Sequence, residues 1–165
     1  MLMLANTQVE LWKNFLEAGQ ISSGVKLTEN QEAYTVFLLQ RFLRGTELMG
    51  MVLAIQYLES LLETRTKRSV LLSDTADASL ILAGLYPERA RRLHVSDYYF
   101  ITMCKQCLEE LASICFEIKR NGEAELYKEI SRTAEDIAIV MCHAKNADTK
   151  SDDFRNMLHG KVFLN

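Results

Sequence analysis

The sequence predicts an all-α fold: a single-domain antiparallel bundle of about six helices, followed by a short terminal helix. Three observations support this. The 165 residues include one proline and seven glycines, too few for the many turns of a β-sandwich or barrel. Apolar residues recur at steps of three and four along most of the chain. No segment alternates apolar and polar residues in the way that a half-buried strand does.

The first helix is predicted over residues 7–18. Thr7 and Glu10 fit a capping box at its start, and Gly19 is expected to end it. A polar loop follows. Residues 1–26 are therefore expected to form an N-terminal helix and linker, which could act as a docking arm on a neighbouring subunit.

The second and third helices carry more apolar surface than one face requires. Thr28 and Gln31 form another capping box, which starts a helix that ends near Gly45. The third helix is predicted over residues 46–64, and its stretch 48–58 is apolar on nearly every side, which favours burial by several partners. These two helices are predicted to be the central antiparallel pair, and their surplus apolar surface could form a dimer interface.

A charged turn is predicted over residues 64–69, and a helix over residues 70–85. The only proline of the chain, Pro87, lacks an N–H group and so suits the first turn of a helix. A short helix is therefore predicted over residues 87–93.

The longest helix is predicted to begin with Ser96 as its cap and to stop at Asn121-Gly122. It carries a narrow apolar seam, which is typical of bundle packing. The seam consists of Phe100, Cys104, Cys107, Leu111, Ile114, Cys115 and Ile118.

The last long helix is predicted over residues 123–145. Because its connection to the preceding helix is short, the two should be antiparallel neighbours. The bundle core is thus expected within residues 27–146. A loosely docked tail, residues 147–165, should contain the short terminal helix, residues 151–159.

Three stretches of this sequence resemble an uncharacterised family of small all-helical gamma-proteobacterial proteins. They are LTENQEAYTVFLLQRFLR from Leu27, LILAGLYPERARRLHVSDYYF from Leu80 and AELYKEI from Ala124. The resemblance covers roughly residues 27–145. It implies a helical fold and brings no activity with it.

The net charge and the hydropathy pattern argue against a nucleic-acid binder and against a membrane-spanning protein. The formal net charge is -3, whereas nucleic-acid binders usually have a basic balance. The most apolar run, Leu48 to Tyr57, is shorter than the roughly 20 residues that span a bilayer. No export signal is recognised, so a cytoplasmic location with reduced thiols is expected. No cofactor is predicted.

Cys104 and Cys107 have the C-x-x-C spacing of redox and zinc sites. His143, on the next helix, could join them as a metal ligand. Because both cysteines lie on the apolar seam, the favoured interpretation is that they pack in the core as small hydrophobic residues.

Asp74 and Asp77, one turn apart on a helix, could share a cation. The favoured interpretation of this pair is a solvated helix face. No E-x-x-H pair occurs, so the signature of a di-iron bundle is missing.

A basic turn contains Arg89, Arg91 and Arg92, which could bind an acidic partner or a nucleic acid. The favoured interpretation is that these arginines are exposed to solvent and offset the dipole at a helix C-terminus. Tyrosines flank this turn and could line a ligand pocket, because each combines an apolar ring with a polar tip, and Tyr98 could contact a partner. The favoured interpretation is that these tyrosines seal the end of the bundle. They are Tyr86, Tyr98 and Tyr99.

These features favour a non-enzymatic interaction, scaffold or regulatory protein, homodimeric through its second and third helices. None of the nucleophile, phosphate-loop, dinucleotide or zinc-protease motifs occurs, so no catalytic residue is assigned. The alternative is a bundle that binds a small ligand or a metal at Cys104, Cys107 and His143, or at the tyrosine junction. A weaker alternative is an adaptor that uses the basic turn.

Overall fold

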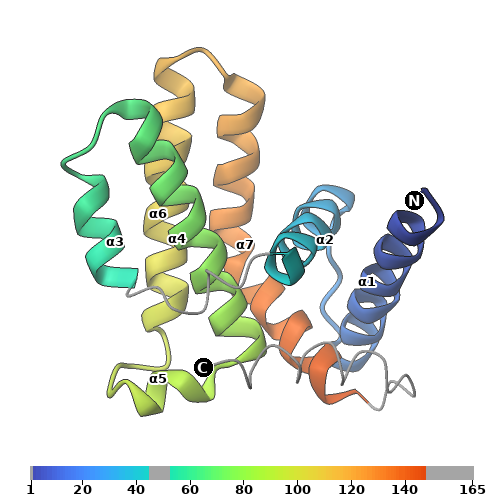
Figure 1. Cartoon of the computed structure of the whole chain (residues 1–165). Coiled ribbons are helices and arrows are strands. Elements are labelled where there is room, and N and C mark those ends of the chain that lie inside the picture. Colours follow the sequence, from blue (N-terminus) through green and yellow to red (C-terminus); the bar gives the residue numbers. More distant parts are fainter. Residues whose placement is uncertain (1, 45–52, 148–165) are drawn as a thin grey trace.

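The computed structural model describes residues 2–44 and 53–147, and Figure 1 shows their arrangement. These residues contain seven α-helices and no strand, which confirms the all-α prediction. The helices are α1 (Leu2–Ser23), α2 (Glu29–Arg44), α3 (Leu53–Ser60), α4 (Arg65–Leu85), α5 (Glu88–Arg92), α6 (Tyr99–Glu117) and α7 (Asn121–Asn146). No helix in this part of the chain is long and apolar enough to cross a membrane.

The centre of the bundle is formed by α4, α6 and α7. Each of these helices packs against the other two, α3 packs on α4, and α1 and α2 lie against α7 (Figure 1). The prediction that the second and third helices form the central pair is therefore wrong.

The helix that is buried on nearly every side is α4, whose residues 75–82 are all buried. The burial of this helix was not predicted from the sequence because the helix contains several polar residues. Thr75 and Ser79 can be buried because each hydroxyl donates to the backbone carbonyl four residues earlier, at 2.7 and 2.6 Å. Small side chains such as these let neighbouring helices approach α4 closely.

The antiparallel pairing of α6 and α7 is confirmed. The seam residues Phe100, Cys104, Cys107 and Leu111 are at most 3% exposed. The Ser131 hydroxyl on α7 donates to the Lys105 carbonyl on α6 at 3.4 Å, which fixes the level at which the two helices meet.

The connection between α6 and α7 corrects a predicted boundary. Lys119 has a left-handed φ of 61°, and the Arg120 N–H donates to the Cys115 carbonyl at 2.8 Å. This Schellman motif ends α6. Asn121-Gly122, predicted to stop the helix, instead opens α7, and the predicted cap Ser96 lies before Tyr98, the residue that precedes α6.

Two more boundaries differ from the prediction. The predicted turn over residues 64–69 is the first part of α4, which begins at Arg65. The predicted third helix ends at Ser60, not Thr64, and its residues 46–52 lie outside the described residues.

At the N-terminus, α1 runs from Leu2 to Ser23, so Thr7 is inside the helix and Gly19 does not end it. By contrast, the capping box of α2 is confirmed. The Thr28 N–H donates to Gln31 Oε1 at 3.0 Å, and the Gln31 N–H donates to the Thr28 hydroxyl at 3.3 Å. The predicted helix over residues 151–159 lies outside the described residues.

Candidate functional site

The two cysteines of the C-x-x-C spacing are buried in the interior. Cys104 and Cys107 are both 0% exposed. Burial raises the pKa of the Cys104 thiol far above its usual range and that of Cys107 to about 12. Both therefore stay protonated at neutral pH, which does not suit a nucleophile.

His143 does not join these cysteines. It is exposed near the end of α7, where its Nδ1 lies 3.1 Å from the Ser22 hydroxyl of α1. Ser131 marks the level of Cys104 on α7, and His143 lies roughly 18 Å further along the axis at 1.5 Å per residue. Within residues 2–44 and 53–147, no three His, Cys, Asp or Glu side chains are grouped to hold a metal ion.

The basic turn is α5, and the structure separates its arginines. Arg91 and Arg92 are exposed, whereas the Arg89 guanidinium lies over the Tyr86 ring, 5.7 Å from its centroid. Lys145 of α7 also lies over this ring, at 4.7 Å. Two cations on one aromatic ring tie α5 and α7 to the end of α4.

The three tyrosines do not form one pocket wall. Tyr86 is 5% exposed, and its hydroxyl has no hydrogen-bond partner among the described residues. Tyr98, 67% exposed, points to solvent, and Tyr99 packs edge-on against Phe100. Tyr98 and Arg91 remain accessible to a partner.

A buried polar cluster joins α2 to α4, and it centres on Asp77. The Tyr34 hydroxyl donates to Asp77 Oδ1 at 3.0 Å, and Arg41 Nη1 donates to Asp77 Oδ2 at 2.5 Å. Arg41 Nη2 also donates to Asp74 Oδ1 at 2.9 Å. The two aspartates thus share one cation, which is the guanidinium of Arg41 rather than a bound metal ion.

The environment of Asp77 perturbs its ionisation. The side chain is 4% exposed, and burial outweighs the attraction of Arg41, so the pKa of Asp77 rises to about 6. Burial also raises the pKa of Tyr34. Perturbed carboxyl groups of this kind are more frequent at functional sites than elsewhere.

A cavity of about 260 Å³ lies beside this cluster, between α2, α4, α6 and α7. Its lining includes Arg41 and Arg120 together with Asp74 and Glu123. Because these charges balance, the cavity favours neither an anion nor a cation. Its other lining residues are Ser69, Val70, Ser73, Leu111, Ile114, Cys115, Ile118 and Tyr127.

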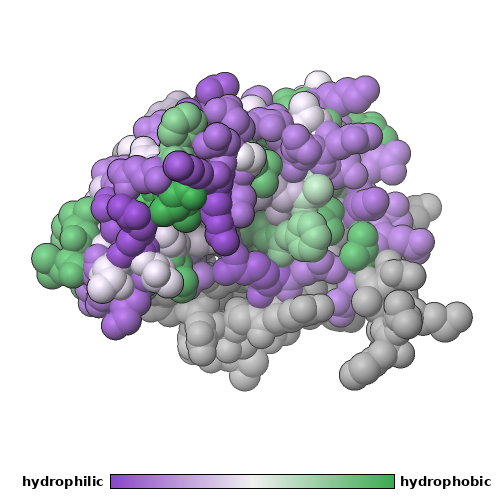
Figure 2. Space-filling view, turned by 90° about the horizontal axis from the view of Figure 1, so that it is seen from above, coloured by the Kyte–Doolittle hydropathy of each residue, from purple (hydrophilic) through white to green (hydrophobic). Residues whose placement is uncertain are grey.

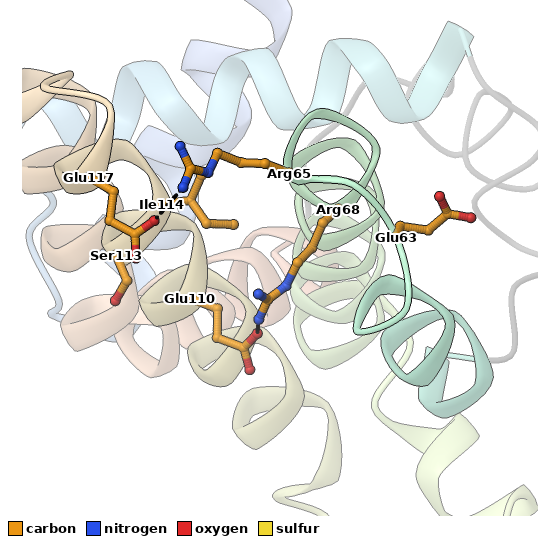
Figure 3. A pocket seen from close by; sticks show the side chains of 7 residues that line it. All are labelled: Glu63, Arg65, Arg68, Glu110, Ser113, Ile114 and Glu117. Atoms are coloured by element: carbon orange, nitrogen blue, oxygen red, sulfur yellow. Dashed lines mark hydrogen bonds and ion pairs between the residues drawn. The ribbon is translucent and has the colours of Figure 1, made fainter.

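A second cavity, of about 370 Å³, opens between the start of α4 and the end of α6 (Figure 3). Arg65 pairs with Glu117 at 3.1 Å and Arg68 with Glu110 at 2.5 Å. Each pair bridges α4 and α6, and Ser113 lies between the two pairs. The Tyr57 hydroxyl of α3 also donates to Glu110, so this carboxylate ties α3, α4 and α6 together.

The outward face of α3 is apolar. Ile55 and Leu58 lie about one helical turn apart on α3 and are 54% and 59% exposed, and Leu62, in the turn that follows Ser60, is 91% exposed. The opposite face, with Ser60 at 0% exposure, packs on α4. Figure 2 shows hydrophobic surface at its left edge, where Figure 1 places the turn between α3 and α4.

Sequence reasoning missed Tyr34 and Arg41 entirely and took Asp77 for a solvated residue. One signal was present, because Asp77 precedes Leu80 and Ile81 by three and four positions and so shares their helix face. An aspartate on an apolar stripe needs a buried partner. The identity of that partner depends on how α2 docks, which has no local signature.

The chain matches no family model, no curated protein and no solved structure. The resemblance of stretches within residues 27–145 to a gamma-proteobacterial family therefore stays a prediction. What the chain does has to be argued from the geometry of its own residues.

Proposed function

We propose that this is a non-enzymatic helical interaction protein that forms a homodimer through the outward face of α3. The observation that carries the proposal is the apolar stripe formed by Ile55 and Leu58 on α3 and by Leu62 in the turn after it, each more than half exposed. Leu61, in the same turn, adds a side chain that is 48% exposed. Contiguous apolar surface of this kind marks interaction sites more often than scattered single residues do.

A second copy of the chain is the partner that best fits this surface. Around a two-fold axis the same patch meets itself, so it must be self-complementary. Close to the stripe in the chain are the exposed Glu59 and the exposed pair of Glu63 with Lys67, whose Nζ lies 3.8 Å from a Glu63 carboxylate oxygen. A rim of both signs beside an apolar centre allows each sign to face its opposite in the second copy.

The remaining features support a role without catalysis. The buried thiols are protonated, and each arginine and glutamate pair of the cavity between α4 and α6 is neutralised within the pair. The four cysteines are free thiols, which fits the cytoplasmic location that we include in the proposal.

The test is the molar mass in solution, measured by sedimentation equilibrium over a range of concentrations. We expect a reversible dimer for the natural sequence and a monomer for Leu58→Glu, because a charge in an apolar contact must be desolvated without a partner.

Ile21→Glu is the matched control. Ile21 is 77% exposed on α1, away from the stripe, so its replacement should leave the dimer intact. A natural protein that remains monomeric at every concentration would refute the proposal. A dimer that Leu58→Glu leaves unchanged would refute the assignment to α3.

A further inference from the structure

The segment between α5 and α6 presents side chains of the kind that protein interfaces favour. Leu93 and Tyr98 are 60% and 67% exposed, and two exposed arginines, Arg91 and Arg92, come directly before Leu93. Tyrosine and arginine are among the residue types that most often dominate the binding energy of an interface. We call these four residues the α5–α6 surface.

Both arginines of this surface are free to bind a carboxylate. Neither Arg91 nor Arg92 has an ion-pair partner among residues 2–44 and 53–147. The negative end of the α4 dipole does not require them, because Lys145 of α7 donates to the Leu85 carbonyl there. The two guanidinium groups therefore remain available to a partner from outside the bundle.

The backbone that carries the α5–α6 surface is fixed to the core from its inner side. Ala90 is 1% exposed, and Val95 packs against the core. The Val95 N–H donates to the Ala90 carbonyl at 3.1 Å, and the His94 N–H donates to the Arg91 carbonyl at 3.2 Å. His94 has a left-handed φ of 55° in this Schellman motif. A surface that is already held in one backbone conformation loses less entropy on binding.

We propose that the α5–α6 surface binds an acidic segment of another protein, in which carboxylates flank an apolar side chain. The carboxylates pair with Arg91 and Arg92, because a guanidinium group fits a carboxylate with two parallel hydrogen bonds. The apolar side chain packs between Leu93 and the ring of Tyr98. Its burial adds affinity that the exposed ion pairs alone do not supply.

The charges around this surface favour a peptide over a nucleic acid. Glu88 and Asp97, both exposed, lie on either side of the two arginines in the chain, and the net charge of the protein is -3. A phosphate backbone is a continuous row of negative charge, which these carboxylates and the net charge repel. A peptide can instead place its acidic residues opposite the arginines alone.

The α5–α6 surface lies away from the contact proposed for the homodimer. The 21 residues of α4 span about 30 Å at 1.5 Å per residue. Leu62 lies in the turn before α4, whereas α5 follows the last residue of α4, so the two are at opposite ends of this helix (Figure 1). The acidic segment is therefore a second partner, whose binding does not depend on the dimer.

The probe that tests the proposal is a library of random short peptides displayed on phage and selected on the full natural chain. We expect the selected peptides to be rich in Asp and Glu and to share an apolar residue. The most frequent peptide is then labelled with a fluorophore and titrated with each variant. Replacing both arginines, by Arg91→Glu and Arg92→Glu, should weaken binding roughly 10-fold or more, because attraction becomes repulsion.

Leu93→Ser tests the apolar part of the surface separately. It should weaken binding by about 3- to 10-fold and leave the salt dependence of the affinity unchanged, since both ion pairs remain. In the double arginine variant the salt dependence should instead be lost. A Leu93→Ser affinity equal to that of the natural protein would overturn the apolar contact.

The matched control is the double variant Lys26→Glu and Arg132→Glu. Both residues are exposed, one before α2 and one on α7, and their replacement changes the net charge by the same amount. This control should bind the peptide as the natural protein does. Three results would overturn the proposal: selection that yields no acidic peptides, equal losses of affinity in the two double variants, or duplex DNA that binds more tightly than the peptide.

Discussion

Gly19 of α1 lies directly against the backbone carbonyl of Val140 on α7. A Cβ atom at position 19 would come within 2.2 Å of that oxygen and 2.8 Å of the Ala144 Cβ. The glycine that sequence reasoning read as a helix stop is therefore a contact point that lets two helices touch backbone to backbone.

Gly19→Ala should destabilise the protein by about 1–3 kcal/mol, because backbone atoms must move to admit the methyl group. Gly122→Ala is the matched control, since a Cβ there meets nothing within 4 Å. It should be neutral or slightly stabilising, because alanine favours the helix. Urea unfolding of the three proteins measures both effects, and equal stability of the two variants would contradict the close contact.

Lys119→Gly should stabilise the protein by about 0.5–1 kcal/mol. Lys119 has φ 61° in the Schellman motif at the end of α6, a conformation that costs a side-chain-bearing residue but not glycine. Lys119→Ala keeps the strain and should gain nothing. The midpoint of thermal unfolding distinguishes the two variants, and a destabilised Lys119→Gly would be the contrary result.

Glu110→Gln should cost about 1–3 kcal/mol, since Glu110 accepts from Tyr57 and pairs with Arg68 in a partly buried place. Glu117→Gln removes an equivalent charge, but its pair with Arg65 is about 60% exposed. That change should cost less than about 0.5 kcal/mol. Guanidinium unfolding compares the two, and similar losses would show that Glu110 does not link the three helices.

Cys142 should react first with a thiol reagent. Of the four cysteines it alone is partly exposed, whereas Cys104, Cys107 and Cys115 are buried. Timed alkylation followed by peptide mass analysis should show one fast site. In Cys142→Ser the fast phase should vanish, and early labelling of Cys104 would contradict its buried position.

Asp77→Asn should stabilise the protein at pH 8 by an amount on the order of 2 kcal/mol. The folded pKa of about 6 exceeds the ordinary value near 3.9, so the folded state binds the proton more tightly. The contribution of Asp77 to stability is therefore greatest below about pH 4 and declines as the pH rises through 6. Urea unfolding at pH 4 and pH 8 should show the variant's advantage only at the higher pH.

Local signals predicted some features well. The capping box of Thr28 and Gln31 involves residues three positions apart, so the sequence contains the whole motif. The seam from Phe100 to Leu111 likewise needs only helical periodicity, and the short connection that follows this helix predicted the pairing of α6 with α7.

The predictions that were wrong concern features that depend on tertiary contacts. Gly19 could end a helix or admit a neighbour, and only the position of α7 decides between these roles. Thr75 and Ser79 looked polar, yet their hydroxyls are satisfied within α4, so the most buried helix did not look apolar. The Asp77 cluster joins residues 36 and 43 positions apart, which no local pattern links.

The contact between α1 and α7 also bears on how the chain folds during synthesis. Ser22 and His143, which meet at this junction, are 121 positions apart, and α7 is the last described helix to leave the ribosome. The apolar face of α1 includes Trp12 and Leu16, which are fully buried in the folded protein. This face can pack against α7 only after α7 has been synthesised. During synthesis, α1 must therefore avoid aggregation until α7 has been made.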